Sequence, residues 1–294
     1  MPQLRLALAQ VNATVGDLAG NADLVVQYCK EAAAQDVHLV VFPEMVLTGY
    51  PIEDLAMRAS LIKASQAAIE DLAVRLEAEG CGDVVAVVGF LDQAVDIVDG
   101  LGIPKNAPLN SVAVIHGGAI VARQAKHHLW NYGVGDEIRN FVAGHTINII
   151  QIGGIDVALA ICEDLWRDGP SAAAKAAEAA LLVVPNGSPY EADKDDVRLD
   201  LCSRRAREAT ASWRTSISSA DRTSSCSTAT RSWSTSSARC SAAPASSHPS
   251  CWSSTSTCLP RRRRCPDRTS VSGVWRSSAR SSALSPTRRT SRAP

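Results

Sequence analysis

The chain has 294 residues, with 30 basic and 30 acidic side chains and a formal net charge of zero. Residues 213–294 hold 14 arginines, no lysine and two acids, so residues 1–212 carry a formal charge of −12 and the tail carries +12. Halves that differ this much rarely share one core, and no run of about 18 apolar residues is present to form a membrane span.

The first half of the chain alternates strand and helix patterns. Leu4–Val11 alternates in hydrophobicity and predicts a strand. Asn21 stands where an N-cap would open a helix that runs to about Gln35. Val37–Phe42 is a short apolar run that predicts a buried strand, and Pro51–Glu79 has a helical pattern.

Glycine pairs mark two hairpins farther along, Gly117-Gly118 and Gly153-Gly154. The strands expected on either side of them are Ser111–Ile115 with Ile120–Ala125, and Ile147–Ile152 with Ile155–Ile161. The other expected elements are a strand at Val84–Leu91, a helix at Ala172–Ala180, a strand at Ala180–Pro185 and a helix at Asp195–Ala209. Many strands with helices between them predict an α/β protein with layered sheets.

Three reactive side chains each follow an apolar strand: Glu44, Lys126 and Cys162. Taken singly, each has an ordinary interpretation, because a cysteine after a strand is usually a small buried hydrophobe. A lone lysine or glutamate there is usually solvated. Strand ends, however, are where a sheet presents reactive groups to a cleft, so the combination is more informative than its parts.

The segments around these residues resemble the three signature stretches of the nitrilase (carbon–nitrogen hydrolase) superfamily. These segments are 41–51, 126–134 and 161–166. Within the superfamily, Gly49–Leu55, Asn131–Gly133 and Cys162–Asp164 are similar to the glutaminase domain of glutamine-dependent NAD⁺ synthetases. The resemblance covers about residues 3–212, in order along the chain.

The resemblance implies an α-β-β-α sandwich and a catalytic triad. Glu44 would be the general base for Cys162 and later for water. Cys162 would attack the glutamine side-chain amide, release ammonia and form a thioester. Lys126 would stabilise the tetrahedral oxyanion and help to hold the cysteine pKa low.

Further positions carry over from the family. Glu137 matches a second glutamate that supports the lysine, although a surface acid in a loop is the ordinary alternative. Tyr132 and Glu163 match residues lining the glutamine pocket, where Glu163 would receive the α-amino group. Ser188 and Lys194 match other pocket residues, for which ordinary turn chemistry is the alternative.

Two positions depart from the family pattern. Leu129-Trp130 stands where the family usually has Leu-Pro, and Gly135 stands where an aromatic residue usually precedes Asp-Glu. Neither change removes a catalytic group. We expect both to loosen the loop that carries Tyr132 and Glu137.

The resemblance implies no cofactor for the glutaminase step, and ATP only in a synthetase domain, whose Ser-Gly-Gly-x-Asp-Ser phosphate loop does not occur in this chain. Expected partners are glutamine, an NAD⁺ synthetase domain and further copies of the chain. No Cys-x-x-Cys spacing occurs, so no metal is expected. The N-terminus runs straight into a strand, which predicts a cytoplasmic location without membrane association.

The tail, residues 213–294, is mostly Ser, Arg, Thr, Ala and Pro and is predicted to be disordered. One hypothesis is out-of-frame translation of a GC-rich gene, because Arg222–Ser234 shifted by one base can spell a family-like strand pair. The alternative is a tail that binds nucleic acid electrostatically, against which its five cysteines and four tryptophans count. Sequencing the gene across codon 212 separates the two.

The leading function is therefore hydrolysis of glutamine by residues 1–212. The runner-up is a free-standing amidase or nitrilase for another small amide, and the third is an inactive fragment. Gly49–Leu55 and Asn131–Gly133 favour glutamine.

Overall fold

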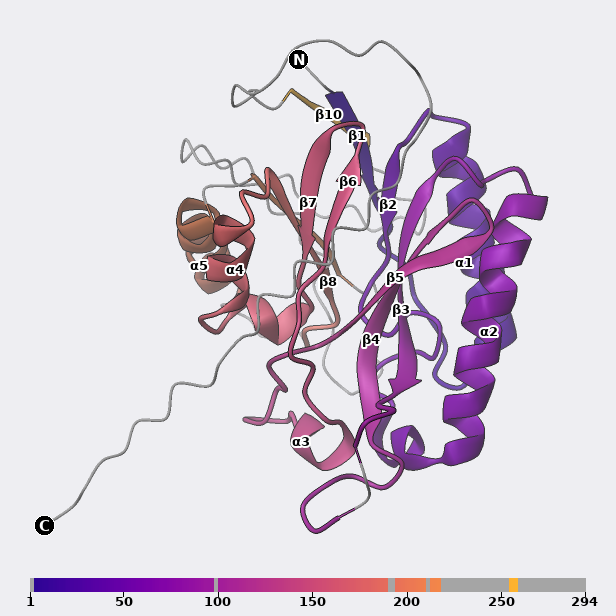
Figure 1. Cartoon of the computed structure of the whole chain (residues 1–294), viewed down its shortest axis with the longest axis vertical. Coiled ribbons are helices and arrows are strands. Elements are labelled where there is room, and N and C mark those ends of the chain that lie inside the picture. Colours follow the sequence, from indigo (N-terminus) through magenta and orange to yellow (C-terminus); the bar gives the residue numbers. More distant parts are fainter. Residues whose placement is uncertain (1–2, 98–99, 190–193, 210–211, 218–253, 259–294) are drawn as a thin grey trace, which may run out of the picture.

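Two β-sheets pack face to face and carry helices on both outer sides (Figure 1). The computed structural model describes residues 3–97, 100–189, 194–209, 212–217 and 254–258. The elements of the first sheet and its helices are β1 (Gln3–Leu8), α1 (Leu18–Ala33), β2 (Leu39–Val41), η1 (Glu53–Met57), α2 (Ala59–Ala78), β3 (Val85–Gln93), β4 (Pro108–His116) and β5 (Ala119–Ala125). Then follow α3 (Glu137–Asn140), β6 (Ile149–Ile152), β7 (Ile155–Leu159), η2 (Cys162–Leu165), α4 (Pro170–Ala176), β8 (Leu181–Asn186), α5 (Lys194–Ala209), β9 (Ser212–Ile217) and β10 (Ser254–Cys258).

The first sheet has the order β10-β1-β2-β3-β4-β5, and the second has the order β6-β7-β8-β9. Strands β1, β2 and β3 run parallel, as do β7, β8 and β9, while β4–β5 and β6–β7 are antiparallel hairpins. Helices α1 and α2 cover the first sheet, and α4 and α5 lie outside the second (Figure 1). The predicted α-β-β-α sandwich and both predicted hairpins are confirmed.

Three apolar layers hold the sandwich together. Strand β3 is buried on both of its faces. On one face, Ala86, Val88 and Phe90 pack with α1 and α2. On the other, Val85 and Val87 pack between the two sheets. A strand buried on both faces reads as a continuous apolar run. The third layer lies between the second sheet and helices α4 and α5.

Two predicted boundaries were wrong. The side chain that caps α1 is Asp17, which accepts a hydrogen bond from the Gly20 N–H at 2.9 Å. Asn21 lies inside the helix, 2% exposed, because its amide pairs with the backbone of Thr14 and Leu47 instead. The long helical stretch begins as the short turn η1 and becomes regular only at α2.

Strand β10, and all of β9 except its first residue, lie in the segment that was expected to be the tail. Strand β9 extends the second sheet beside β8, and β10 pairs with β1 of the first sheet. Each covers a strand edge whose N–H and C=O groups would otherwise lack sheet partners. The rest of the tail, 218–253 and 259–294, lies outside the described residues.

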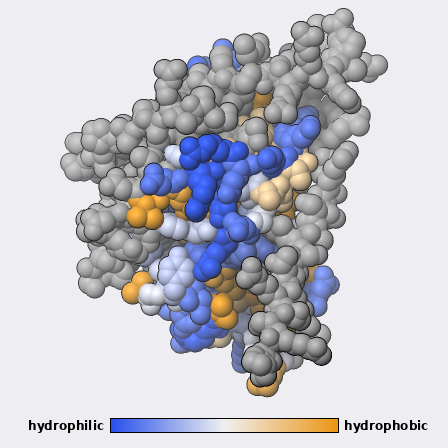
Figure 2. Space-filling view, turned by 90° about the vertical axis from the view of Figure 1, so that its left-hand side faces the viewer, coloured by the Kyte–Doolittle hydropathy of each residue, from blue (hydrophilic) through white to orange (hydrophobic). Residues whose placement is uncertain are grey.

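The face that carries α4 and α5 has a band of hydrophilic side chains with apolar spots beside it (Figure 2). Among the described residues, no helix combines the length and hydropathy needed to cross a membrane.

Candidate active site

Three strand ends bring Glu44, Lys126 and Cys162 to one place. Glu44 follows β2, Lys126 follows β5 directly, and Cys162 begins η2 just after β7. Strands β2 and β5 belong to one sheet and β7 to the other, so both sheets contribute to the site. All three side chains are buried.

Gly89 lets the turn that carries Glu44 lie directly on β3. A Cβ at Gly89 would lie 2.2 Å from the Met45 nitrogen and 2.8 Å from the Pro43 oxygen. Since both neighbours are backbone atoms, any side chain would push the turn away. The Leu47 N–H also donates to the Gly89 carbonyl at 2.9 Å, which ties the turn to the sheet. The position of the carboxylate therefore depends on a glycine in the neighbouring strand.

Lys126 is held between two carboxylates. Its Nζ lies 2.7 Å from Oε1 of Glu44 and 2.7 Å from Oε2 of Glu137, with the lysine side chain fully buried. Burial by itself lowers the pKa of the Lys126 ammonium, but the carboxylates of Glu137 and Glu44 raise that pKa well above its usual range. The lysine is therefore a permanent cation at the site.

Asn110 joins the two carboxylates. Its Nδ2 donates to Oε1 of Glu44 at 2.8 Å and to Oε1 of Glu137 at 2.9 Å. The Tyr50 hydroxyl also donates to Oε1 of Glu137 at 3.2 Å, and the Trp130 N–H donates to Oε2 at 2.8 Å. Glu137 thus has four partners and its side chain is 4% exposed, so it is fixed in position.

Cys162 has a backbone φ of 44°, in the left-handed region that a non-glycine residue adopts only under constraint. Its Sγ–H donates to Oδ1 of Asn186 at 3.0 Å. Burial and the charge of Glu44 raise the pKa of the thiol well above its usual range, although Lys126 and the Gly187 N–H act in the opposite direction. Lys126 lowers the pKa of the thiol, as expected, but desolvation by burial outweighs the lysine and the pKa is raised on balance. A base must therefore remove the thiol proton.

Asp164 fixes the turn that presents the cysteine. One oxygen accepts from the Ile161 N–H at 2.9 Å, and the other accepts from the N–H groups of His127 at 3.1 Å and His128 at 2.7 Å. The same carboxylate therefore joins η2 to the segment after Lys126. Burial raises the pKa of Asp164 to about 6.

Arg205 of α5 holds the other end of η2. Its Nε donates to the Leu165 carbonyl at 2.8 Å and Nη2 donates to the Trp166 carbonyl at 3.1 Å, while Nη1 pairs with Asp168 and Glu208. The guanidinium side chain is 4% exposed. Helix α5 is thus connected to the cysteine turn by one arginine.

Replacing Arg205 with Met is expected to lower the free energy of unfolding by about 1–3 kcal/mol, because the buried Leu165 carbonyl and the partly buried Trp166 carbonyl lose their donors. Urea denaturation measures the change. Arg207→Met, an exposed position on the same helix, is the control and should change stability by less than about 0.5 kcal/mol. Equal stability of the two variants would contradict this role for Arg205.

A pocket of about 240 Å³ opens beside the thiol, lined by Trp130, Tyr132, Cys162, Glu163, Trp166, Ser188 and Pro189. The Tyr132 hydroxyl donates to Oε2 of Glu163 at 3.0 Å. Oε1 of Glu163 pairs with Nε of Arg167 at 2.9 Å, so both oxygens of this 3%-exposed side chain already have partners. Ser188 lies in the pocket wall, and the side chain of Lys194 lies outside the described residues.

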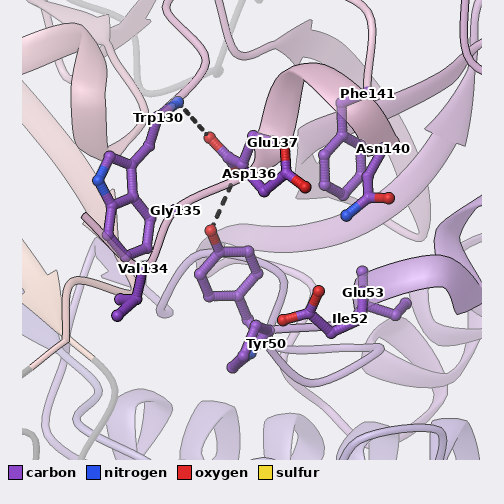
Figure 3. A pocket seen from close by; sticks show the side chains of 11 residues that line it. Tyr50, Ile52, Glu53, Trp130, Val134, Gly135, Asp136, Glu137, Asn140 and Phe141 are labelled. Carbon is purple, nitrogen blue, oxygen red and sulfur yellow. Dashed lines mark hydrogen bonds between the residues drawn. The ribbon is translucent and has the colours of Figure 1, made fainter. Parts of the chain in front are cut away.

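Two hydrogen bonds join the first and last residues of the loop between Trp130 and Glu137. The Trp130 N–H donates to the Glu137 carboxylate, and the Glu137 N–H donates to the Trp130 carbonyl at 2.9 Å. Figure 3 shows the hydrogen bonds from Trp130 and Tyr50 to Glu137, beside a second pocket. The expected loosening of this loop is therefore not seen at its two ends.

Five residues of this network were not among the predicted site residues: Tyr50, Asn110, Asp164, Asn186 and Arg205. Asn186 had a usable signal, since it ends an apolar strand just as Glu44 and Cys162 follow theirs. Asn110 and Arg205 had none, because neither lies in a motif that points to the site.

The carbon–nitrogen hydrolase family model matches residues 5–208 of this chain. Glutamine-dependent NAD(+) synthetase of Rhodobacter capsulatus is 32% identical over 206 residues, which are 70% of this chain and 35% of that protein. The chain spans about a third of the length of the curated relatives that it matches.

Solved structures share the fold. Glutamine-dependent NAD+ synthetase of Acinetobacter baumannii, in complex with ADP, superposes with a TM-score of 0.74 and 29% identity over 82% of this chain and 43% of that chain. A mutant amidase of Nesterenkonia sp. AN1 carries the acetamide moiety of fluoroacetamide on its active-site cysteine. That structure superposes with a TM-score of 0.67 and 20% identity, covering 81% of this chain and 85% of that one.

Proposed function

Because this chain belongs to the carbon–nitrogen hydrolase family, we propose that it hydrolyses the side-chain amide of glutamine through a thioester on Cys162. The observation that carries the proposal is the buried Glu44–Lys126–Glu137 cluster, whose charges act on the Cys162 thiol. An amide is a poor electrophile and ammonia a poor leaving group, so the reaction needs a nucleophile, a proton carrier and an oxyanion cation together.

In the first half-reaction, Glu44 takes the thiol proton as Sγ attacks the amide carbon, which forms the C–S bond. The oxygen of the tetrahedral intermediate becomes negative, and Lys126 stabilises it from a site that excludes water. Glu44 then gives its proton to the amide nitrogen. The C–N bond breaks, and ammonia leaves a glutamyl thioester on Cys162.

In the second half-reaction, Glu44 takes a proton from water as the water oxygen attacks the thioester. The C–S bond breaks, and the sulfur takes the proton back from Glu44. The product leaves with a neutral γ-carboxyl group, which loses its proton to the solvent as glutamate forms. Glu137 takes no part in bond making in this proposal. Its contacts with Lys126 and Asn110 keep the cation and Glu44 at their places.

Glutamine is supported as the substrate by the charges at the pocket. Glu163 lines the pocket and forms an ion pair with the exposed Arg167. A free amino acid would bring an ammonium for the glutamate and a carboxylate for the arginine. Tyr132 and Ser188 would complete the pocket. Lys194 is proposed on the family resemblance alone.

The similar synthetases suggest where the ammonia goes. They are named for glutamine-dependent NAD(+) synthesis, so we propose that the ammonia serves a synthetase domain, which would use ATP to make NAD⁺ from its deamido precursor. Further copies of the chain would be additional partners.

The test is ammonia release from glutamine by the purified chain, with Cys162→Ala as the blank. We expect release by the unmodified chain alone, together with fluoroacetamide labelling of the Cys162 peptide. Ammonia from another ω-amide, with none from glutamine, would identify a different amidase. A folded chain with neither ammonia release nor labelling would be an inactive fragment.

A further inference from the structure

Trp130 lines two pockets. On one side is the pocket of about 240 Å³ that contains Cys162 and Tyr132. On the other is the pocket of about 290 Å³ in Figure 3, which Glu137 lines. Trp130 is the one side chain that lines both of these pockets.

Gly135 makes room for this indole. A Cβ at Gly135 would lie 2.3 Å from Cδ2, 2.4 Å from Cε2 and 2.7 Å from Cγ of Trp130. The indole therefore occupies the volume that a side chain at 135 would need. Gly135 lines the second pocket and not the cysteine pocket, so any side chain there would push the indole toward Cys162.

The backbone of Trp130 is also fixed in position. The backbone of Trp130 pairs in both directions with Glu137, whose carboxylate is held by Lys126. The edge of the indole lies against Tyr132, with ring centroids 6.1 Å apart. The Glu137 carboxylate therefore positions both Trp130 and the Lys126 cation.

We propose that Trp130, seated by Gly135, is the specificity-determining residue that limits the size of the group reaching Cys162. For the amidase function on which this inference rests, this residue would admit the unsubstituted ω-amide of glutamine and exclude amides with a bulky substituent on nitrogen. Specificity is thereby produced by exclusion, in addition to the attractive contacts at Glu163.

The test uses electrophiles of two sizes, so that it does not depend on glutamine being the substrate. Iodoacetamide and N-phenyliodoacetamide alkylate the thiol by the same displacement of iodide, and peptide mass spectrometry measures the rate at Cys162. The relevant quantity is the ratio of the rate with the large reagent to that with the small one. The variants are Trp130→Ala, Gly135→Phe and the double substitution.

Trp130→Ala should raise the ratio by about tenfold or more. An apolar pocket that fits one group and excludes a larger one changes relative rates by about this factor. Gly135→Phe should lower it, and Gly135→Ala does the same if the larger change does not fold. In the double variant the new ring refills the vacated volume, so the ratio should return to within about threefold of the original. Gly133→Asn, where no atom lies within 4 Å of a built Cβ, is the control in the same loop.

A folded Trp130→Ala variant with an unchanged ratio would overturn the proposal, and so would independent effects of the two single changes. Glutamate release gives the second readout: hydrolysis of N-ethylglutamine also frees ethylamine, and its rate relative to that of glutamine should rise in Trp130→Ala. If the chain hydrolyses no amide but the alkylation ratios follow the prediction, the proposed function fails and the size limit set by Trp130 stands.

Discussion

Replacing Lys126 with Met is expected to reduce ammonia release by more than about a thousandfold and to lower the free energy of unfolding by about 3–5 kcal/mol. The substitution leaves Glu44 and Glu137 facing each other around Asn110 with no cation between them, in a site that excludes water. Two uncompensated buried carboxylates repel each other and cannot be solvated. Both stability and activity should therefore fall.

Two further variants show whether the lost cation causes the fall in stability and activity. Lys63→Met changes an exposed lysine of α2 and should leave both properties unchanged. Glu137→Gln combined with Lys126→Met removes one of the two negative charges, so it should recover part of the lost stability and none of the activity. Denaturant unfolding and an ammonia assay measure the outcomes. Full stability of the single Lys126→Met variant would contradict the buried ion-pair arrangement.

Replacing Glu44 with Gln is expected to reduce kcat by about 10²–10⁴-fold. Because burial raises the pKa of the Cys162 thiol well above its usual range, the thiolate does not form at neutral pH without a base. The residual activity should then depend on hydroxide, so it should keep rising through pH 9. The unmodified chain should instead reach a plateau, since its base is internal.

The pH–rate profiles of the two proteins provide the measurement, and Glu178→Gln, an exposed glutamate beyond α4, is the control. A Glu44→Gln variant with the same plateau as the unmodified chain would show that another group accepts the thiol proton.

The sequence predicted the parts of this molecule that depend on local pattern. Glycine pairs located both hairpins, and continuous apolar runs located the central strands that precede Glu44 and Cys162. Prediction from the sequence failed where a residue far along the chain determines the hydrogen bonds of a side chain. Asn21 has the chemistry of a cap, but its amide bonds instead with the backbone of Thr14, seven residues before it, and of Leu47, 26 residues after it.

The same limit applies to the site. The triad could be named from motifs, but the state of its thiol could not, because the pKa of Cys162 depends on how much solvent two packed sheets exclude. Asn110 is a single polar residue in an apolar strand, and nothing local shows that it joins two carboxylates from different loops. The composition of the tail predicts a poor core former, but nothing local in it predicts that short segments pair with an edge of each sheet.

The Lys126 cluster has a consequence for how the site responds to its surroundings. Two carboxylates and one ammonium leave one surplus negative charge, which the proton transfer from Cys162 to Glu44 only relocates. The tetrahedral intermediate carries the same total. Dissolved ions screen charges over a distance of about 8 Å in physiological solution, and they act mainly on exposed pairs such as Arg75 with Asp23. Because no net charge enters or leaves the buried site between the free thiol and the tetrahedral intermediate, we expect the rate of thioester formation to depend little on ionic strength.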